Sequence, residues 1–281
     1  MILVLLITEA GFFHFCGHDE FQRRQSPFAT QVTYGSIDSS IRIKFNLPDY
    51  ENDDQICKTI GTSITWNYKT YTCTANDLIS NSKKNALENT LNNVKDYFSS
   101  FLKVHPLIGS YNPKDFLDTT ITEMISGDNT DVQIDVFVRP FGCETKQALT
   151  AIVQIDEATS RPIQSVMFIN SKKIPKTAQS ATTDDSRVFW SLVHETLHAI
   201  GISSILFPKF HPTTSNDPYS NSNTFRSGKR NFLITPNAHT FAINHYDRNT
   251  LSINGESFAS GIELDTFPES TSSHPNIRRY L

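Results

Sequence analysis

The chain has 281 residues, of which 38% are hydrophobic and 19% charged, a composition typical of a globular protein with one large domain or two lobes. The net charge of −4 and the sequence pI of about 6.1 argue against nucleic acid or an anionic membrane as the main partner. No basic run of the kind that binds phosphate groups occurs in the sequence.

The amino terminus is strongly apolar at residues 1–7, a stretch too short for a bilayer span of about 20 residues. We interpret it as the core of a signal peptide that ends near Ala10, with a buried strand as the alternative. Alternating apolar and polar side chains then predict a half-buried strand at residues 41–47. Residues 63–73 are rich in β-branched and aromatic side chains and predict a second strand.

A long helix is predicted at residues 83–104, where apolar side chains recur at spacings of three and four and Ser82 is the candidate cap. Alternation predicts a strand at residues 132–138. Two further strands are predicted at 148–155 and 166–169.

A second helix is predicted from Asp184 to Ile200, with Asp184, Asp185 and Ser186 in its first turn and cap, and Gly201 at its end. After this helix the pattern changes.

Residues 202–230 are rich in Pro, Ser, Asn and Thr and predict a long loop. A short helix is predicted at 236–246, with Thr235 as its cap and Pro236 at its first position. We expect the remainder to be irregular. The order of elements predicts an α+β lobe followed by a smaller, loop-rich lobe.

The most informative segment, residues 194–198, reads His-Glu-Thr-Leu-His inside the second predicted helix. Residues four apart lie one helical turn apart on the same face, so the imidazoles of His194 and His198 converge on one point. Imidazole is a good zinc ligand. Glu195 lies beside the pair and can accept a proton from an activated water. The motif therefore predicts a catalytic zinc site.

Catalytic zinc uses three protein ligands and one open position, so a third ligand is needed. A compact arrangement would place a third histidine at position 204, which is Ser204. Spacing alone leaves the following downstream candidates open: His211, His239, His245, His274, Glu256, Glu263 and Glu269.

At this point the sequence resembles the leishmanolysin family of metallopeptidases. In that family, His-Glu-x-x-His-Ala-hydrophobic-Gly is followed by a long insertion and a third histidine in a Ser-rich stretch. This chain has the first pattern at residues 194–201 and Ser-Ser-His at 272–274. The resemblance implies a zincin- or metzincin-like fold, a twisted mixed sheet, and one zinc ion held by His194, His198 and His274. The other histidines are then ordinary polar or loop residues.

Two further stretches support the resemblance. Residues 14–19 match the family's His-x-Cys-x-His-Asp propeptide motif, in which the thiolate, here that of Cys16, occupies the open zinc position. The segment 73–79 is similar to the family's Cys-Thr-Ala-Glu-Asp-Ile-Leu, which supports a disulfide between Cys57 and Cys73, a pair that would close a short loop.

The sequence also departs from the family pattern. Members carry a methionine turn after the third histidine, whereas the methionines here are Met1, Met124 and Met167, all before His274. The family's partner for Cys143 is absent, which predicts an unpaired thiol. We therefore expect a chain that is truncated at its carboxyl terminus or that has lost part of the site.

The resemblance implies a secreted or cell-surface zinc endopeptidase acting on proteins or peptides. For such an enzyme we expect an extended substrate in the cleft, adding to a sheet edge around Val166 to Asn170. One alternative is a peptidase whose third ligand is a glutamate. The other is a catalytically silent relative that binds partners at a cell surface. The predicted organisation is a signal peptide at 1–10, a propeptide-like segment at 11–35, a catalytic lobe at 36–201 and an incomplete second lobe at 202–281.

Overall fold

A computed structural model describes residues 17–47, 52–117, 119–142, 145–210, 220–225, 228–247, 249–253, 256–259, 261–264 and 273–274. The predicted signal segment, Cys16 and Cys143 lie outside these ranges. The chain divides into two compact units. The sheet unit is Phe21–Gly201, and the second unit comprises Met1–Glu20 with Ile202–Leu281. No helix in the described ranges is long and apolar enough to cross a membrane.

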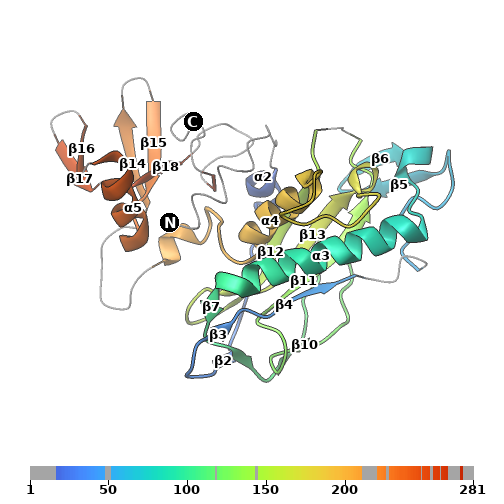
Figure 1. Ribbon diagram of the computed structural model, residues 1–281, viewed down its shortest axis with the longest axis horizontal. Helices are drawn as coiled ribbons and strands as arrows, with labels where there is room; N and C mark the ends of the chain where they lie inside the picture. Colours follow the sequence, from blue (N-terminus) through green and yellow to red (C-terminus); the bar gives the residue numbers. More distant parts are fainter. Residues whose placement is uncertain are drawn as a thin grey trace. The chain divides into compact units, whose positions relative to one another are not determined.

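The sheet unit is built on a mixed five-stranded sheet in the order β1-β12-β13-β11-β4 (Figure 1). The strands are β1 (Phe28–Thr30), β12 (Ala148–Asp156), β13 (Pro162–Asn170), β11 (Val132–Arg139) and β4 (Ile43–Asn46). Only β12 and β13 pair in an antiparallel manner within this sheet. The predicted strands are confirmed, and β13 is longer than its predicted core. β1, from the propeptide-like range, pairs with Gln154–Asp156 of β12.

The central strands are buried on both faces rather than on one, because both faces of the sheet are covered. The order of strands also corrects one expectation. The mechanistic hypothesis places an extended substrate at a sheet edge around Val166 to Asn170, but β13 is paired on both sides and offers no free edge. The edges of this sheet are β1 and β4.

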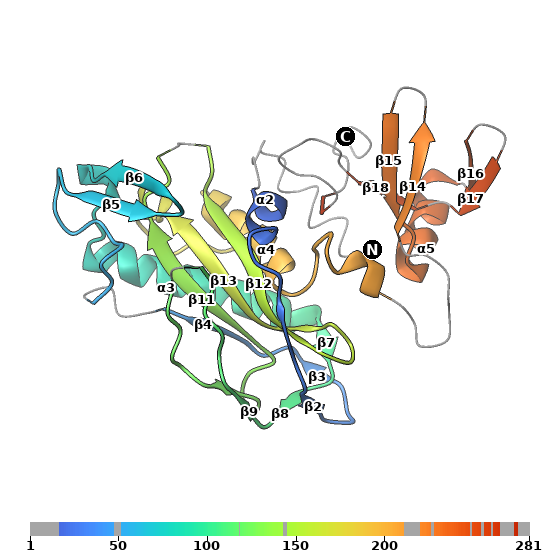
Figure 2. The same cartoon turned by 180° about the vertical axis from the view of Figure 1, so that it is seen from behind.

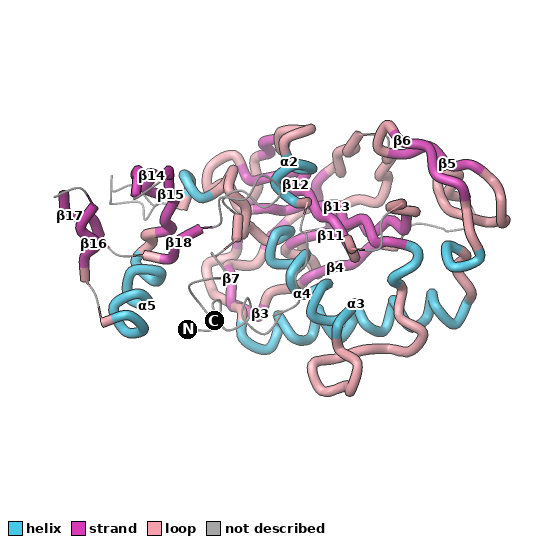
Figure 3. Tube along the Cα trace, turned by 90° about the horizontal axis from the view of Figure 1, so that it is seen from above, coloured by secondary structure: helices cyan, strands magenta, loops and turns pink. Residues whose placement is uncertain are grey.

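Two helices pack side by side on one face of the sheet, as Figures 1 and 3 show from two directions. They are α3 (Asn81–Phe101) and α4 (Arg187–Ala199). The cap of α3 is Ser80 rather than the predicted Ser82, since the Ser80 hydroxyl accepts a hydrogen bond from Lys83 N. α3 also ends earlier than predicted, because Lys103–Val104 forms β7 and pairs with β3 (Ser39–Ser40).

The opposite face carries an aromatic core, on the side that faces the viewer in Figure 2. The Phe168 ring lies against Phe21, Trp66 and Phe137, with ring centroids 5.3, 5.5 and 5.5 Å away. The predicted strand at 63–73 is a hairpin instead, made of β5 (Ser63–Trp66) and β6 (Lys69–Thr72). It turns at Asn67 and Tyr68, which adopt positive φ angles of 52° and 61°.

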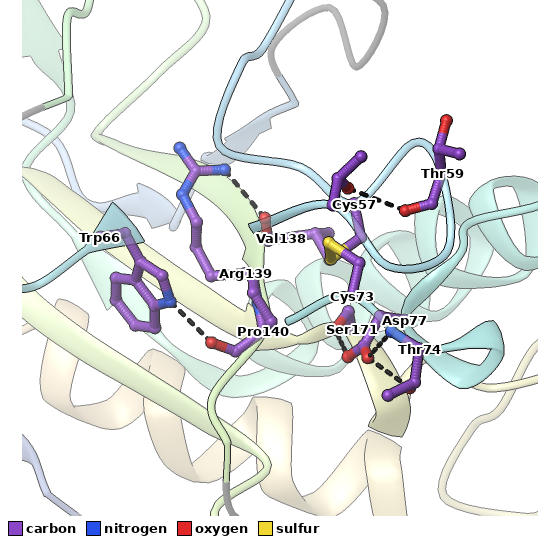
Figure 4. The surroundings of a disulfide bond; sticks show 11 residues. Cys57, Thr59, Trp66, Cys73, Thr74, Asp77, Val138, Arg139, Pro140 and Ser171 are labelled. Atoms are coloured by element: carbon purple, nitrogen blue, oxygen red, sulfur yellow. Dashed lines mark hydrogen bonds between the residues drawn. A yellow bond between two sulfur atoms is a disulfide. The ribbon is translucent and has the colours of Figure 1, made fainter. Parts of the chain in front are cut away.

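The disulfide between Cys57 and Cys73 is present and fastens the chain before this hairpin to its end (Figure 4). Next to it, Trp66 Nε1 donates a hydrogen bond to the carbonyl of Pro140 at 2.6 Å. Asp77 accepts a hydrogen bond from the Ser171 hydroxyl at 2.7 Å and so links the segment after the bridge to the end of β13. The predicted pairing is confirmed.

The described part of the sheet unit also contains three short two-stranded antiparallel ribbons. They are β2 (Thr33–Tyr34) with β8 (Leu107–Ile108), β3 with β7, and β9 (Ser110–Tyr111) with β10 (Ile125–Ser126). Asp131 ties this region together, because its carboxylate accepts hydrogen bonds from the Arg42 guanidinium and from Leu107 N. Burial alone would raise the pKa of Asp131, but these hydrogen bonds outweigh it and hold the pKa below its usual range.

The second unit contains more regular structure than expected. The predicted loop at 202–230 includes β14 (Ser220–Phe225) and the start of β15 (Gly228–Leu233), which pair in an antiparallel hairpin; β15 also pairs with β18 (Ile262–Leu264). The residues expected to be irregular also form β16 (Thr250–Ile253) and β17 (Glu256–Ala259). The remaining short helices in the described ranges are α2 (His18–Gln22), η1 (Ala75–Asp77), η2 (Ser171–Lys173) and η3 (Phe207–Lys209).

The predicted short helix is confirmed as α5 (Pro236–Tyr246), with the Thr235 hydroxyl accepting a hydrogen bond from Ala238 N at 3.3 Å. α5 packs on β18, and Ala238 contributes to a small apolar core with Phe207, Leu233 and Leu264. Loop composition at 202–230 was therefore a poor guide, because strands built from Ser, Asn and Thr lack the apolar alternation used to predict strands.

Candidate metal centre

The helix α4 carries the motif, and its amino terminus is capped by a residue outside the helix. The Gln179 side-chain oxygen accepts hydrogen bonds from Val188 N at 2.9 Å and Phe189 N at 3.2 Å. Gln179 is itself held by α3, through Thr90 Oγ1 at 3.0 Å and Asn93 Nδ2 at 2.8 Å. Ser186 stands at the cap position, as predicted, but it makes no side-chain capping bond. α3 thus fixes where α4 begins.

The carboxyl end of α4 is attached to the sheet. The Ser165 hydroxyl, on β13, donates a hydrogen bond to the carbonyl of Ala199 at 2.9 Å. Gly201 has a φ of 132°, and its N–H bonds to the carbonyl of His198 at 3.2 Å. A residue with a side chain is strained at such a φ, so glycine is needed here. The predicted end of the helix is confirmed.

The paired histidines converge as predicted. His194 Nε2 and His198 Nε2 lie 3.1 Å apart, and the two rings are nearly perpendicular at 86°. His198 is buried, with 1% of its surface exposed, and His194 is half-buried. Glu195, between them in sequence, is fully buried at 0% exposure. Burying an ionisable carboxyl group is costly unless it is paired or neutralised, and such groups are concentrated at functional sites.

The geometry of this pair fits a shared metal ion. Two nitrogens at about 2.0–2.1 Å from one tetrahedral zinc lie roughly 3.3 Å apart. The observed 3.1 Å between the Nε2 atoms is close to that value. At this separation the two nitrogens could otherwise only share a hydrogen bond, which requires a proton on one Nε2 atom. A divalent cation between the rings would take the place of that proton. The donor set therefore suits zinc.

The candidate third ligand, His274, belongs to the second unit, where it is half-buried. Its neighbour Ser273 is buried and accepts a hydrogen bond from Ser204 N at 2.7 Å. Ser273 also donates one to Asp19. Ser204 lies shortly after α4 in the chain, so the stretch that carries His274 is fastened to the segment that leaves the helix.

The other third-ligand candidates have less to support them. His245 is exposed on α5 and stacks on Phe241 with centroids 5.1 Å apart, and His239 is half-buried on the same helix. Glu263 is buried on β18. Glu256 lies in β17, while His211 and Glu269 lie outside the described residues.

Two elements of the site were not predicted from the sequence. Gln179 precedes α4 in a loop, and nothing in its local pattern marks it as a cap. The sequence marks Asp19 only as part of the propeptide-like motif, and its partners Ser204 and Ser273 are remote in sequence. Such contacts join distant segments, so no local periodicity reveals them.

A helix with two converging imidazoles and a buried carboxylate beside them is typical of metallopeptidases. The leishmanolysin family model matches residues 29–278, and the chain belongs to this peptidase family. Its members are metallopeptidases that are generally zinc-dependent and act on proteins or peptides. No curated protein matches the chain significantly.

Proposed function

We propose that this chain is a zinc-dependent endopeptidase in which His194, His198 and His274 hold one zinc ion and Glu195 is the general base. The observation that carries the proposal is the 3.1 Å separation of the two Nε2 atoms on α4, with buried Glu195 beside them. Among the residues that the structure describes, the same three histidines form a group of side chains that could hold a metal ion. The family match to residues 29–278 adds support.

When bound, zinc would act as a Lewis acid that polarises the scissile carbonyl and lowers the pKa of water towards about 7. The residues of the chain supply the proton transfers. The Glu195 carboxylate accepts a proton from the attacking water and then donates it to the leaving amine, as a general base and then a general acid. Its burial strengthens its interactions with charge that develops nearby.

We also propose that the protein works outside the cytosol, either secreted or at a cell surface. The Cys57–Cys73 bridge supports this, because structural disulfides persist mainly in oxidising compartments. Fractionation of cells that produce the full chain tests it: recovery of the protein in the cytosol with both thiols reduced would contradict the assignment.

The test of the proposed chemistry is Glu195→Gln in the full chain, with Cys16→Ser in both proteins because the resemblance implies inhibition by that thiol. We expect the rate of peptide cleavage to fall by about 10²–10⁴-fold, with one zinc per chain retained. Glu157→Gln is the control, since Glu157 is an exposed carboxylate in the turn between β12 and β13. Undiminished cleavage by Glu195→Gln would refute its role. Zinc binding without cleavage by the Cys16→Ser parent would instead favour a silent binding protein.

A further inference from the structure

Within the second unit, Asp19 joins two segments that are far apart in sequence. Its carboxylate accepts a hydrogen bond from the Ser204 hydroxyl at 2.7 Å and one from the Ser273 hydroxyl. It also accepts one from Ser273 N at 3.3 Å. The Ser273 hydroxyl in turn accepts a hydrogen bond from Ser204 N at 2.7 Å. We call Asp19, Ser204 and Ser273 the serine clamp.

Two residues of the serine clamp are buried, and Ser204 is half-buried. Asp19 is 3% exposed and Ser273 is 1% exposed. Beside it, His18 Nε2 and the Ser203 hydroxyl, both fully buried, lie 2.8 Å apart in a second hydrogen bond between the same segments. Hydrogen bonds to an ionised carboxylate are stronger than those between neutral groups. Asp19 therefore contributes most of the strength of the serine clamp, because three of the clamp's four hydrogen bonds end on that carboxylate.

The two serines of the clamp lie close in sequence to the proposed zinc ligands. Ser273 directly precedes His274, and Ser204 lies in the turn that follows α4. Without a tether, His274 would be held to the helix histidines only through a long loop, whose closure carries an entropic penalty. With the clamp, Ser273 is fixed to a residue only a few positions beyond His198 in the chain.

We propose that Asp19 is a positioning residue that holds the Ser273–His274 segment in place for zinc binding. This inference rests on the proposed function. It gives the amino-terminal segment a constructive role in building the metal site, through a carboxylate that does not itself contact the ion. All the partners of Asp19 described above are hydrogen-bond donors, as expected for a carboxylate that orders hydroxyl and amide groups.

The test uses the full chain with Asp19→Ala and Asp19→Asn, and Glu20→Ala as the control. Glu20 is an exposed carboxylate next to Asp19 on α2 and is not part of the clamp. The first measurement is zinc dissociation into a chelator. Because loss of a residue that orients a ligand typically weakens metal binding by about 10–100-fold, we expect a change of that size for Asp19→Ala. Asp19→Asn keeps one side-chain oxygen that can accept from the hydroxyls but loses the charge and the second oxygen, so it should lie in between, and Glu20→Ala should match the parent.

A double-mutant cycle with His274→Ala separates positioning from general stability. If Asp19 acts through His274, Asp19→Ala should have no further effect on zinc dissociation once His274 is removed. Equal effects of Asp19→Ala in both backgrounds would overturn the proposal, since the carboxylate would then act on the site by another route.

The second measurement does not depend on zinc. The amide of Ser273 donates to Asp19, so hydrogen exchange in a peptide spanning Ser273 and His274 should accelerate in Asp19→Ala apoprotein and not in Glu20→Ala. Unchanged exchange would overturn the clamp whatever the zinc result. If the parent chain binds no zinc while Asp19→Ala still accelerates this exchange, the proposed function is contradicted and the clamp remains supported.

Discussion

The segments that carry the three proposed zinc ligands are held by different kinds of interaction. His194 and His198 are brought together by the spacing of one helix, which is capped by Gln179 and attached to β13. The segment of His274 is held by hydrogen bonds from serines to Asp19. A ligand pair on a helix follows from local sequence, whereas a ligand from a remote segment depends on partners that local sequence does not identify.

The largest expected effect is the loss of zinc affinity when one of the proposed histidine ligands is removed, either on α4 or in the remote segment. We expect both His198→Ala and His274→Ala to weaken zinc binding by more than the roughly 100-fold typical of residues that only orient ligands. His198→Ala should also lower the unfolding free energy of the apoprotein, because its ring is 1% exposed and packed, while half-buried His274 should matter less.

Chelator competition and urea unfolding of the apoprotein measure the two effects. His239→Ala, on α5, is the control and should change neither zinc affinity nor the zinc stoichiometry. Full zinc affinity in His274→Ala would assign the third ligand elsewhere, and Glu263→Ala would be the next variant to measure.

The disulfide offers the next largest effect. It spans a separation of 16 residues, so replacing Cys57 and Cys73 by serine should lower the unfolding free energy by about 3 kcal/mol. Both cysteines belong to the same apolar cluster as Val166 and Phe168, which lie on the face of β13 opposite to that of Ser165, the residue that contacts α4. The bridge therefore lies on the face away from α4, and zinc affinity should be unchanged. A parallel loss of zinc affinity would show that the ligand pair His194 and His198 depends on the opposite face of the sheet as well as on the spacing within α4.

Asp131 predicts an acid-sensitive contribution to the sheet unit. Its pKa is lowered in the folded protein, so its stabilisation is fully present above the ordinary aspartate pKa of about 3.9 and is lost as pH falls through the folded value. Asp131→Asn should cost about 1–3 kcal/mol at neutral pH, and less under strongly acidic conditions. Urea unfolding between pH 7 and pH 2 measures this, with exposed Asp96→Asn as the control. A pH-independent cost would refute the role of charge.

The regular parts of the sheet unit could be predicted because their signals are local. Alternation located β4 and β11, and the three- and four-residue spacing located α3. The hairpin β5–β6 was predicted as one strand, because Asn67 and Tyr68 do not form the usual Asn-Gly turn pair. The β14–β15 hairpin was missed since its strands are polar. Register and strand order are set by contacts between distant segments, which explains the mistaken edge at β13.

The motif histidines could be predicted from sequence for the same reason, and the supports around them could not. Gln179 and Asp19 act on segments to which no periodic pattern connects them. The family resemblance supplied His274, which spacing alone had left among several candidates. Resemblance can therefore name a remote ligand, while the structure shows which hydrogen bonds hold its segment.

The cap of α4 gives a smaller effect that sharpens the comparison. Gln179→Met keeps the volume of the side chain but removes the oxygen that accepts from Val188 N and Phe189 N. We expect a loss of about 1 kcal/mol in unfolding free energy. Ser186→Ala, at the position that the sequence predicted as the cap, should have little effect because Ser186 makes no capping bond. If Ser186→Ala lowers the unfolding free energy in urea more than Gln179→Met does, Ser186 rather than Gln179 is the effective cap of α4.

The smallest expected effect is a gain, at the β5–β6 turn. Tyr68 is 88% exposed, and its φ of 61° is unfavourable for a residue with a side chain. Glycine adopts this conformation without strain but loses more backbone entropy on folding, so Tyr68→Gly should stabilise the protein by only about 0.5 kcal/mol. Tyr68→Ala removes the same exposed ring and keeps the strain, so it should give no gain. If both variants destabilise equally in urea, the ring contributes more than the turn geometry, and the hairpin depends on contacts that its local backbone does not reveal.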